Sequence, residues 1–363
     1  MGELTEFLLS LKEPHEILKE RGLPVYLYGT GDGADKISAY LEEKGVKIRG
    51  VFASDGFVRD REYRGYRVRS LGEVEKEEGV IAAVQCFGLE PDECGAVAEK
   101  LKNHLWIAPA VSVYGSTRID RAFVRAHSDE IERVYAKLSD ELSKALYRAV
   151  LAYSVSGEPA FLLTGDAKAE ETPPRAYYER RGVHLDVGAF DGDTALETLE
   201  NNPSVEKILA FEPDENTFRK LCRRTAGLPV EPMRCAVSDK AGSGAFSGDK
   251  GRGSHLESGA GEVPVVTLDG VCGFPFVSSD GMNVCSIKID AEGQDKEVLR
   301  GGANLITSRA PAICVSAYHR AEDLTELPLL LELLNYRSEL FFRKKRCVPA
   351  WDTVFYLIPK RLP

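Results

Sequence analysis

The stretch of residues 183–214, VHLDVGAFDGDTALETLENNPSVEKILAFEPD, constrains the fold of this chain more than any other. It begins with a short apolar run, which is typical of a buried parallel strand. A turn at residues 188–192 follows, and the pattern then predicts a helix whose N-cap is Asp193 or Thr194. A second apolar run ends in Glu212, about 20 residues after the turn, which is the spacing of the acid in a nucleotide-binding βαβ unit.

Two carboxylates distinguish this unit from a dinucleotide site. Asp186, inside the strand, and Asp193, at the helix start, stand where a pyrophosphate would lie, so they repel a diphosphate and suit a cationic ligand. Because Glu212 can also accept hydrogen bonds from a ribose diol, the ligand implied is S-adenosylmethionine, an adenosine with an ammonium and a sulfonium group. A plain strand, turn and helix without a ligand is the alternative. The residues expected at this site are Asp186, Gly188, Ala189, Phe190, Gly192, Asp193, Thr194, Glu212 and Pro213.

Several separated blocks carry a family resemblance. They are DVGAFDGDT, AFEPDENTFRKL, CAVSD, VVTLDGV, IKIDAEGQDKEVLRGG, SAYHRAEDL and WDTVFYLIP. In this order they resemble the FkbM-type methyltransferase family, and they cover roughly the second half of the chain. The resemblance implies a class I methyltransferase fold, an α/β domain with a seven-stranded, mostly parallel, doubly wound sheet. It also implies S-adenosylmethionine as methyl donor, usually a hydroxyl oxygen as acceptor, and a position beside the adenine for Ser238.

A second group of polar residues lies at the end of the predicted strand Val284–Asp290 and just beyond it. A central parallel strand is expected to be apolar on both faces, yet Lys288 and Asp290 lie on one face, and Glu292 follows at the turn. Ligands bind beyond the carboxyl ends of such strands, so Asp290 should share the crevice with the cofactor residues. The alternative is a buried ion pair between Lys288 and Asp290. His319 follows the next predicted strand, and the candidate catalytic residues are therefore His319, Asp290, Lys288 and Glu292.

Two mechanisms fit these residues. In the first, His319 or a carboxylate removes the proton of the acceptor hydroxyl, since the ordinary histidine pKa of about 6.5 suits work near neutral pH. In the second, Asp290, Glu292 and His319 hold a divalent metal ion that lowers the pKa of the hydroxyl. We rank the metal second, because ligand distances across separate strands cannot be derived from a sequence.

The first ~120 residues predict a smaller Rossmann-like α/β domain. The segment GTGDGA, with Gly29, Gly31 and Ala34, follows a predicted strand, and Asp55 follows the next. These residues predict a nucleotide or nucleotide-sugar site, similar to the N-terminal domains of sugar-modifying enzymes. A structural or dimerising Rossmann remnant, which would make the protein a homo-oligomer, is the alternative.

The predicted boundaries are residues 1–122 for the Rossmann-like domain, 123–175 for a helical connector and 176–363 for the methyltransferase domain. Residues 128–154 predict amphipathic helices with a cap near Asp140 between them. The glycine-rich residues 240–261, which include His255, predict a hairpin or a lid over the acceptor. The basic run FFRKKR predicts a solvated strand edge.

Composition limits the other function classes. The 363 residues carry a formal net charge of -10, which argues against a nucleic-acid or anionic-membrane partner. The eight cysteines form no C-x-x-C pair, which predicts free thiols and a cytoplasmic protein. The sequence as a whole therefore predicts an O-methyltransferase acting on a sugar or another small hydroxylated metabolite. A nicotinamide-dependent oxidoreductase centred on Gly29 and Gly31, and a cofactor-sensing scaffold without activity, are the alternatives.

Overall fold

The computed structural model describes residues 2–58, 62–247, 255–256, 262–271, 283–335 and 337–360, without the side chains of residues 55, 245–247 and 255–256. It divides the chain into two compact units. The N-terminal unit comprises Met1–Tyr135, Lys144–Glu171 and Lys344–Asp352, and the C-terminal unit comprises Ala136–Ser143, Thr172–Arg343 and Thr353–Pro363. The chain therefore returns to the N-terminal unit near its end. The domain boundaries that the sequence predicts at residues 122 and 175 remain a prediction.

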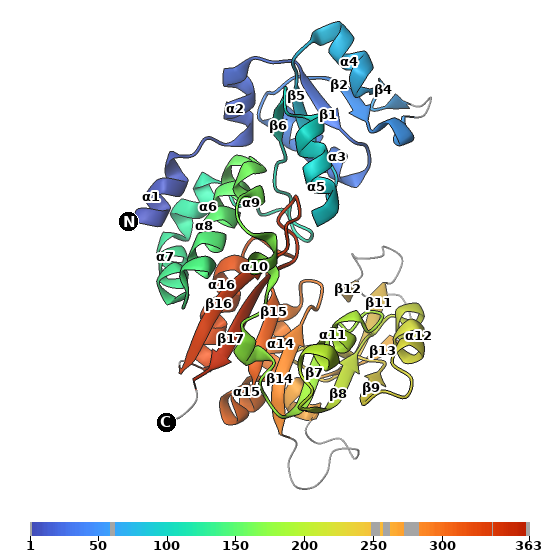
Figure 1. Ribbon diagram of the computed structural model, residues 1–363, viewed down its shortest axis with the longest axis vertical. Helices are drawn as coiled ribbons and strands as arrows, with labels where there is room; N and C mark the ends of the chain where they lie inside the picture. Colours follow the sequence, from blue (N-terminus) through green and yellow to red (C-terminus); the bar gives the residue numbers. More distant parts are fainter. Residues whose placement is uncertain are drawn as a thin grey trace. The chain divides into compact units, whose positions relative to one another are not determined.

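The N-terminal unit is built on a six-stranded sheet in the order β3-β4-β2-β1-β5-β6 (Figure 1). Its strands are β1 (Val25–Tyr28), β2 (Ile48–Ala53), β3 (Glu62–Tyr63), β4 (Tyr66–Ser70), β5 (Ala82–Gln85) and β6 (Leu105–Ile107). All neighbours are parallel except β3 and β4. Every residue of β1 is buried, as expected of a strand in the middle of a parallel sheet. This arrangement is the predicted Rossmann-like sheet.

The helices that precede residue 172 are α1 (Glu3–Ser10), α2 (Pro14–Arg21), α3 (Asp32–Glu43), α4 (Leu71–Glu78), α5 (Pro91–Lys100), α6 (Arg121–Ala126), α7 (Ser128–Lys137), α8 (Glu141–Ser156), α9 (Ala160–Leu163) and α10 (Ala167–Glu171). The predicted break between two amphipathic helices is confirmed, because α7 ends at Lys137 and α8 begins at Glu141. The Asp140 carboxylate accepts the backbone N–H of Ser143 at 2.6 Å and so caps α8.

The C-terminal unit contains a seven-stranded sheet in the order β16-β17-β15-β14-β7-β8-β9. Its strands are β7 (Gly182–Val187), β8 (Val205–Phe211), β9 (Val230–Met233), β14 (Val284–Ile289), β15 (Ala312–Ser316), β16 (Ser338–Lys344) and β17 (Thr353–Pro359). The strands from β15 to β9 are parallel, and β17 runs antiparallel to β15. The predicted seven-stranded, mostly parallel sheet is confirmed.

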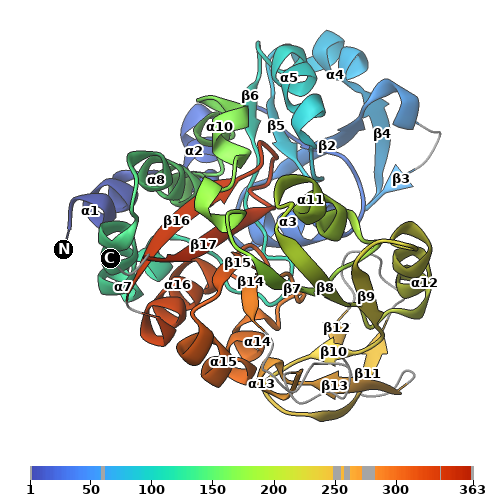
Figure 2. The same ribbon diagram turned by 60° about the horizontal axis from the view of Figure 1, so that its bottom comes forward.

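Helices cover both faces of this sheet. They are α11 (Asp193–Asn201), α12 (Glu215–Arg224), α13 (Leu268–Val271), α14 (Asp295–Gly301), α15 (Ala303–Arg309) and α16 (Asp323–Leu334). Figure 2 shows α11 on one side of the sheet and α14, α15 and α16 on the other. Right-handed crossovers require this, because the chain moves from β7 toward β9 in its first half and from β14 toward β15 in its second. The order of the strands reverses at β7 and β14, and this pair positions the site.

Residues 229–237 contain an apolar run that predicts one strand, but in the structure they contribute to two sheets. β9 ends at Met233, and β10 (Ala236–Val237) belongs to a second sheet in the order β10-β13-β11-β12. Pro232 explains part of this, because proline has no N–H for a further neighbour and favours an edge strand. In the second sheet β11 (Gly242–Ser247) pairs antiparallel with β13 (Glu262–Val266), which favours the hairpin over the lid. β12 (His255–Leu256) pairs with β11, but the His255 side chain lies outside the described residues.

The prediction of a solvated edge for FFRKKR is wrong for two of its basic residues. Arg343, in the C-terminal unit, is buried and donates to the Asp140 carboxylate at 2.8 Å. Lys344, in the N-terminal unit, is buried as well and pairs with the Glu170 carboxylate at 2.7 Å. Both charges are therefore compensated inside the fold, which a basic run in a sequence does not reveal.

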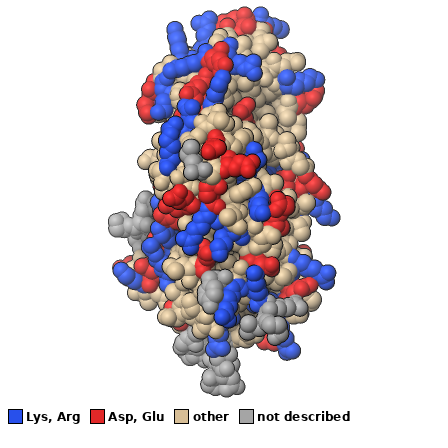
Figure 3. Space-filling view, turned by 90° about the vertical axis from the view of Figure 1, so that its left-hand side faces the viewer, with Lys and Arg blue, Asp and Glu red and all other residues tan. Residues whose placement is uncertain are grey.

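The cysteines, the helices and the surface charge of the described residues bear on the expectations from composition. Among the cysteines that it describes, Cys86, Cys94, Cys222, Cys235, Cys285, Cys314 and Cys347 are all free thiols. Within the described residues, no helix combines the length and the apolar character needed to cross a bilayer. On the face drawn in Figure 3, basic and acidic side chains of the described residues are interspersed in small groups, so neither sign forms a broad field there.

Candidate cofactor and catalytic site

The carboxyl ends of four parallel strands meet where the strand order of the C-terminal sheet reverses. β7 lies between β8 and β14, with Val187 opposite both Phe211 and Ile289. The residues that follow these strand ends are Gly188, Glu212 and Asp290, which the structure therefore brings together as the sequence predicted. β15 ends beside β14, with Ser316 one residue beyond the last paired position, and His319 follows it. Ligands of open α/β sheets bind at such a reversal point.

Gly188 is required by its protein neighbours. Its φ is +74°, and the N–H groups of Gly188 and Ala189 both donate to the Phe211 carbonyl at 3.0 Å. A Cβ at Gly188 would lie 1.9 Å from the carbonyl oxygen of Asp290, which is backbone and cannot move aside alone. The sequence predicted this glycine at the cofactor site, where the absence of a Cβ would let a ligand come close. In the structure the close approach is made by the end of β14.

The rest of the turn differs from the sequence prediction at its helix start. The N-cap of α11 is Gly192, with φ of +92°, so the prediction of Asp193 or Thr194 as N-cap is wrong. The Asp193 carboxylate is exposed and accepts the N–H of the next residue, Thr194, at 2.8 Å. Gly192 can take this position because a positive φ costs glycine little. Phe190, also with positive φ, is about half exposed (48%) and lies in the turn itself.

Asp186 is a buried carboxylate beneath the turn. Its Oδ2 accepts the Thr194 hydroxyl at 2.7 Å, and its Oδ1 lies 3.4 Å from the Lys288 ammonium without a hydrogen-bond partner among the described residues. Lys288 also donates to the Gly188 carbonyl at 2.7 Å. Burial alone would lower the pKa of Lys288, but the carboxylates of Asp186 and Asp290 raise it above its usual value.

The partner of Lys288 differs from the one considered in the sequence. The alternative reading paired Lys288 with Asp290, two residues along the same strand. In the structure Lys288 stands opposite Asp186 in the register of β14 and β7, and the ion pair forms across these strands. Side chains opposite each other on adjacent strands are closer than those two positions apart on one strand. Lys288 therefore supports the Gly188 turn from below.

Glu212 is held at the end of β8 by two backbone N–H groups. Oε2 accepts the N–H of Phe190 at 3.0 Å, and Oε1 accepts the N–H of Asp214, just beyond Pro213, at 2.8 Å. Burial raises the pKa of Glu212 to about 7, and the neighbouring Asp214 adds to the rise, against the lowering effect of these hydrogen bonds. The carboxyl is therefore fixed in orientation and titrates near neutral pH.

Ser238 follows β10 in the second sheet. Its N–H donates to the Val266 carbonyl at 2.9 Å, and its hydroxyl lies 3.4 Å from the Asp239 carboxylate. A Cβ at Gly301, the last residue of α14, would lie 2.1 Å from the Ser238 carbonyl oxygen. This residue therefore packs against the end of α14, and its place beside an adenine stays a prediction.

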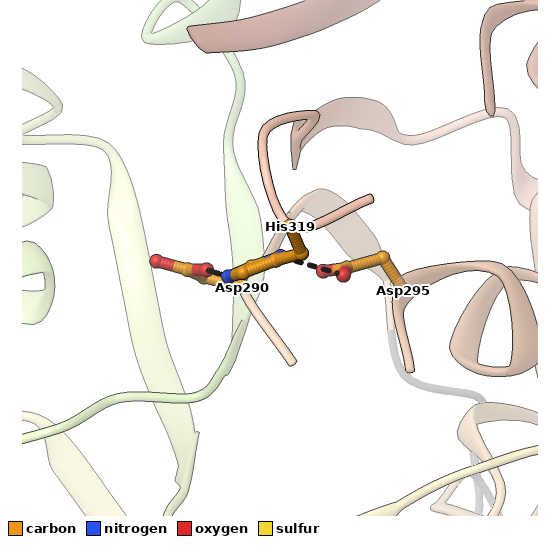
Figure 4. A group of neighbouring side chains, drawn as sticks. All are labelled: Asp290, Asp295 and His319. Carbon is orange, nitrogen blue, oxygen red and sulfur yellow. Dashed lines mark hydrogen bonds and ion pairs between the residues drawn. The ribbon is translucent and has the colours of Figure 1, made fainter. Parts of the chain in front are cut away.

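His319 stands between carboxylates on both sides of its ring (Figure 4). The ring is fully buried, with Nδ1 at 3.0 Å from Asp295 Oδ2. Nε2 lies 3.3 Å from Asp290 Oδ1 and 3.5 Å from Glu292 Oε2. Burial would lower the pKa of His319, but Asp295 and then Asp290 and Glu292 raise it to about 10. Nδ1 therefore hydrogen-bonds the Asp295 carboxylate, while Nε2 faces the carboxylates of Asp290 and Glu292.

Asp295 was not predicted from the sequence as a site residue. It is buried at the first position of α14, and it accepts the N–H groups of Ala291 at 2.8 Å and Gly293 at 3.2 Å in addition to His319. Its only signal in the sequence is an acid at a predicted helix start, which normally indicates no more than a favourable helix-dipole contact. Tyr318, also missed, donates its hydroxyl toward Asp290 Oδ1 at 3.5 Å.

The glycines of the N-terminal fingerprint also lie at a reversal of strand order, because β1 is flanked by β2 and β5. Gly29 and Gly31 have positive φ, and Gly31 is the N-cap of α3. A Cβ at Gly33 would lie 2.3 Å from the Cys86 carbonyl oxygen, so this glycine lets α3 approach the end of β5. The Asp55 side chain lies outside the described residues. A nucleotide site at Gly29, Gly31 and Asp55 stays a prediction.

Comparisons with known proteins agree with this geometry. The family described as the methyltransferase FkbM domain matches residues 186–338. A curated relative, the hexuronic acid methyltransferase AglP of Haloferax volcanii, is 31% identical over 140 residues, which cover 37% of this chain and 56% of that protein. The chain thus matches little more than half the length of this relative.

One solved structure matches nearly the whole chain. The crystal structure of the methyltransferase FkbM from Methylobacillus flagellatus KT superposes with a TM-score of 0.65 at 17% identity, covering 98% of this chain and 97% of that chain. At this identity the likeness concerns the fold. The resemblance drawn from the sequence blocks is confirmed: this chain carries a methyltransferase FkbM domain in residues 186–338, and its seven-stranded unit has the class I methyltransferase fold.

Proposed function

We propose that this protein is an S-adenosylmethionine-dependent O-methyltransferase whose acceptor is a hydroxyl of a sugar or another small metabolite. The observation that carries the proposal is the placement of Glu212, Gly188 and Asp186 around one turn at the reversal point of the sheet. The family of residues 186–338 supports the activity. Because the Haloferax relative is a hexuronic acid methyltransferase, hexuronic acids are the first acceptor class to assay.

The residues at the turn fit the proposed cofactor. Each oxygen of the Glu212 carboxylate accepts one backbone N–H, which leaves further lone pairs for the two hydroxyls of a ribose. The acids near the turn outnumber the bases Lys288 and Arg224, so the local charge favours a cation; these acids are Asp186, Asp191, Asp193, Glu212 and Asp290. Asp186 Oδ1 in addition has unused hydrogen-bonding capacity.

The cofactor supplies an electrophilic methyl group, so the chain mainly has to hold two molecules in line and to accept a proton. Glu212 would orient the ribose, while Lys288 and Thr194 fix the turn through Gly188 and Asp186. Asp290 and Glu292 are partly exposed, at 28% and 31% of their side chains, and form the solvent side of the His319 cluster. These carboxylates are the groups best placed to receive the hydroxyl proton, since they reach solvent while the ring of His319 is fully buried.

We expect Glu212→Gln to weaken S-adenosylmethionine binding about 10- to 100-fold, because hydrogen bonds to a charged acceptor contribute about 1.5–3 kcal/mol. The amide would also place an NH2 group against the N–H of Phe190 or of Asp214, where the carboxylate accepts both. Isothermal titration calorimetry measures the change. The control is Glu215→Gln, an exposed acid on α12 whose partners are Arg219 and Arg234. Equal affinity of the Glu212 variant and wild type would contradict the ribose assignment.

We expect the affinity for S-adenosylmethionine to rise about tenfold between pH 6 and pH 8, because only the ionised Glu212 accepts both ribose hydroxyls and its pKa is about 7. Binding should therefore release a proton near neutral pH, which calorimetry in buffers of different ionisation enthalpy detects. Glu212→Gln should remove this dependence. An affinity that stays flat over this range in the wild type would show that the titration of Glu212 is not linked to binding.

The raised pKa of Glu212 also makes the stability of the fold depend on pH. The folded protein holds the Glu212 proton up to about pH 7, whereas the unfolded chain loses it near 4.5. The contribution of this group is therefore fully present at low pH and is lost as the pH rises from about 4.5 to about 7.

A product assay separates the proposed enzyme from its alternatives. Formation of S-adenosylhomocysteine that depends on an added hexuronic acid or neutral sugar would support the methyltransferase. Saturable S-adenosylmethionine binding without turnover on any such acceptor would favour a cofactor-sensing scaffold. Binding of NAD in place of S-adenosylmethionine would favour the oxidoreductase and overturn the proposal.

A further inference from the structure

Three side chains at the ends of β14 and β15 present their donor atoms to one another. His319 Nε2 lies 3.3 Å from Asp290 Oδ1 and 3.5 Å from Glu292 Oε2. Nitrogen and oxygen ligands lie about 2.0–2.2 Å from a metal such as zinc, so neighbouring ligand atoms in octahedral or tetrahedral geometry are about 3.0–3.5 Å apart. Each of the two carboxylate oxygens therefore lies at the distance from Nε2 that is expected of two ligands of one ion.

The other side of the His319 ring is held by a buried carboxylate. Asp295 Oδ2 lies 3.0 Å from Nδ1, and the backbone N–H groups of Ala291 and Gly293 fix the Asp295 carboxylate in turn. The donor atoms of Asp290, Asp295 and His319 lie within 4.8 Å of one another. Because Asp295 occupies Nδ1, the ring presents Nε2 to Asp290 and Glu292, and metal-ligating histidines are oriented by such a carboxylate.

The cluster is open on one side only. His319 and Asp295 are buried, whereas Asp290 and Glu292 each expose about a third of their side chains. Catalytic metal sites have this form, with protein ligands on one side and a free coordination position for water or substrate on the other. A site of one imidazole and two carboxylates suits a first-row divalent ion such as Mn²⁺ or Zn²⁺.

We propose that Asp290, Glu292 and His319 bind one divalent metal ion, with Asp295 as the positioning residue that directs Nε2 toward it. The ion lies beside Gly188, because Asp290 N donates to the Val187 carbonyl at 3.0 Å at the same strand ends. Its open position is the place for the acceptor hydroxyl, which an ion makes more acidic. This last step rests on the proposed methyltransferase function, whereas the binding of the ion does not.

The ion site is tested by titrating Mn²⁺ into the chelator-treated full chain, with calorimetry and electron paramagnetic resonance as readouts and no methyl donor present. We expect one Mn²⁺ per chain and at least a tenfold loss of affinity in both Asp290→Asn and Glu292→Gln. Glu326→Gln, which removes an exposed acid on α16 paired with Lys296, is the matched control and should bind as the wild type does. Glu292→Gln changes a partly exposed side chain, so it keeps the test valid if Asp290→Asn fails to fold.

The positioning role of Asp295 has its own readout. We expect Asp295→Asn to lower Mn²⁺ affinity about 10- to 100-fold, as the loss of an outer-shell carboxylate does in other metal sites. Raising the Mn²⁺ concentration should restore one ion per chain, which an unfolded variant would not do. Failure to restore it in a folded variant would overturn the positioning role.

Two further outcomes separate this inference from the proposed function. The ion site is overturned if neither Mn²⁺ nor Zn²⁺ binds, or if binding is unchanged in both Asp290→Asn and Glu292→Gln. Calorimetry with S-adenosylmethionine in the presence of a chelator tests the cofactor site independently. A chelator that abolishes turnover while leaving this affinity unchanged supports the role of the ion at the acceptor, and unchanged turnover overturns that role.

Discussion

Gly188→Ala is expected to lower the free energy of unfolding of the C-terminal unit by about 2–5 kcal/mol. Two costs add. The φ of +74° at this position costs a residue with a Cβ about 1–2 kcal/mol. The Cβ would also lie 1.9 Å from the Asp290 carbonyl oxygen, and such overpacking costs about 1–3 kcal/mol.

The functional consequence should be as large. To relieve the contact, the ends of β7 and β14 must separate, which moves Asp290 away from His319 and the turn away from Glu212. A displacement of about 1 Å can cost a factor of about 100 in rate, so we expect turnover to fall at least this much. The Lys288 bond to the Gly188 carbonyl should weaken too.

Gly227→Ala is the matched control for this variant. Gly227 belongs to the same unit and has a φ of +81°, but a Cβ there would meet nothing within 4 Å. It should therefore show the cost of the backbone conformation alone, about 1–2 kcal/mol, with ligand binding unchanged. Both tryptophans, Trp106 and Trp351, lie in the N-terminal unit, so unfolding of the C-terminal unit is best followed by hydrogen exchange. Equal effects of the two substitutions would contradict the packing argument.

Lys344→Met is expected to destabilise the N-terminal unit by about 3–5 kcal/mol, because it leaves the buried Glu170 carboxylate without its main partner. Lys344 and Glu170 are each no more than 2% exposed, and the Lys344 ammonium also donates to the Leu162 carbonyl at 2.9 Å. Arg346 lies 3.9 Å from Glu170 on the exposed side and compensates only in part. Tryptophan fluorescence during urea unfolding measures the loss, since both tryptophans report on this unit.

The neighbouring residue provides the control. Lys345 is more than half exposed and forms an ion pair with Asp352 at 3.4 Å, so Lys345→Met should cost at most about 1 kcal/mol. The double variant Lys344→Met with Glu170→Met should recover at least half of the loss, because it removes both buried charges together. A double variant as unstable as Lys344→Met alone would mean that the charge of Glu170 is not the cause.

Site residues could be predicted where their position depends on local sequence patterns, but not where it depends on contacts between distant segments. Each strand of the C-terminal sheet is predicted by a local apolar run, and parallel strands bring their carboxyl ends to one edge. The positions of Gly188, Glu212, Asp290 and His319 could therefore be predicted. Asp295 could not be found, because its role depends on the distance between the start of α14 and a ring that follows β15. In the sequence it looks like any acid in the first turn of a helix.

Ion pairing was the least predictable property. Lys288 has two acids within reach along the chain, yet it pairs with Asp186 on the adjacent strand. Arg343 and Lys344 occur in one basic run, yet each is buried against an acid about 170–200 positions earlier in the chain. A sequence gives the number of charges, but the cost of burying a charge depends on the partner that the fold supplies.

The sequence by itself determined the class of both sheets, the position of the turn at Gly188 and the family of residues 186–338, because these depend on short periodic patterns and turn residues. Only the tertiary structure decided that Gly188 makes room for the end of β14, that the buried ring of His319 lies between three carboxylates, and that a late basic segment completes the N-terminal unit. The physical reason is that burial, pKa and close packing arise between residues far apart in the chain, and no local pattern encodes the distance between them.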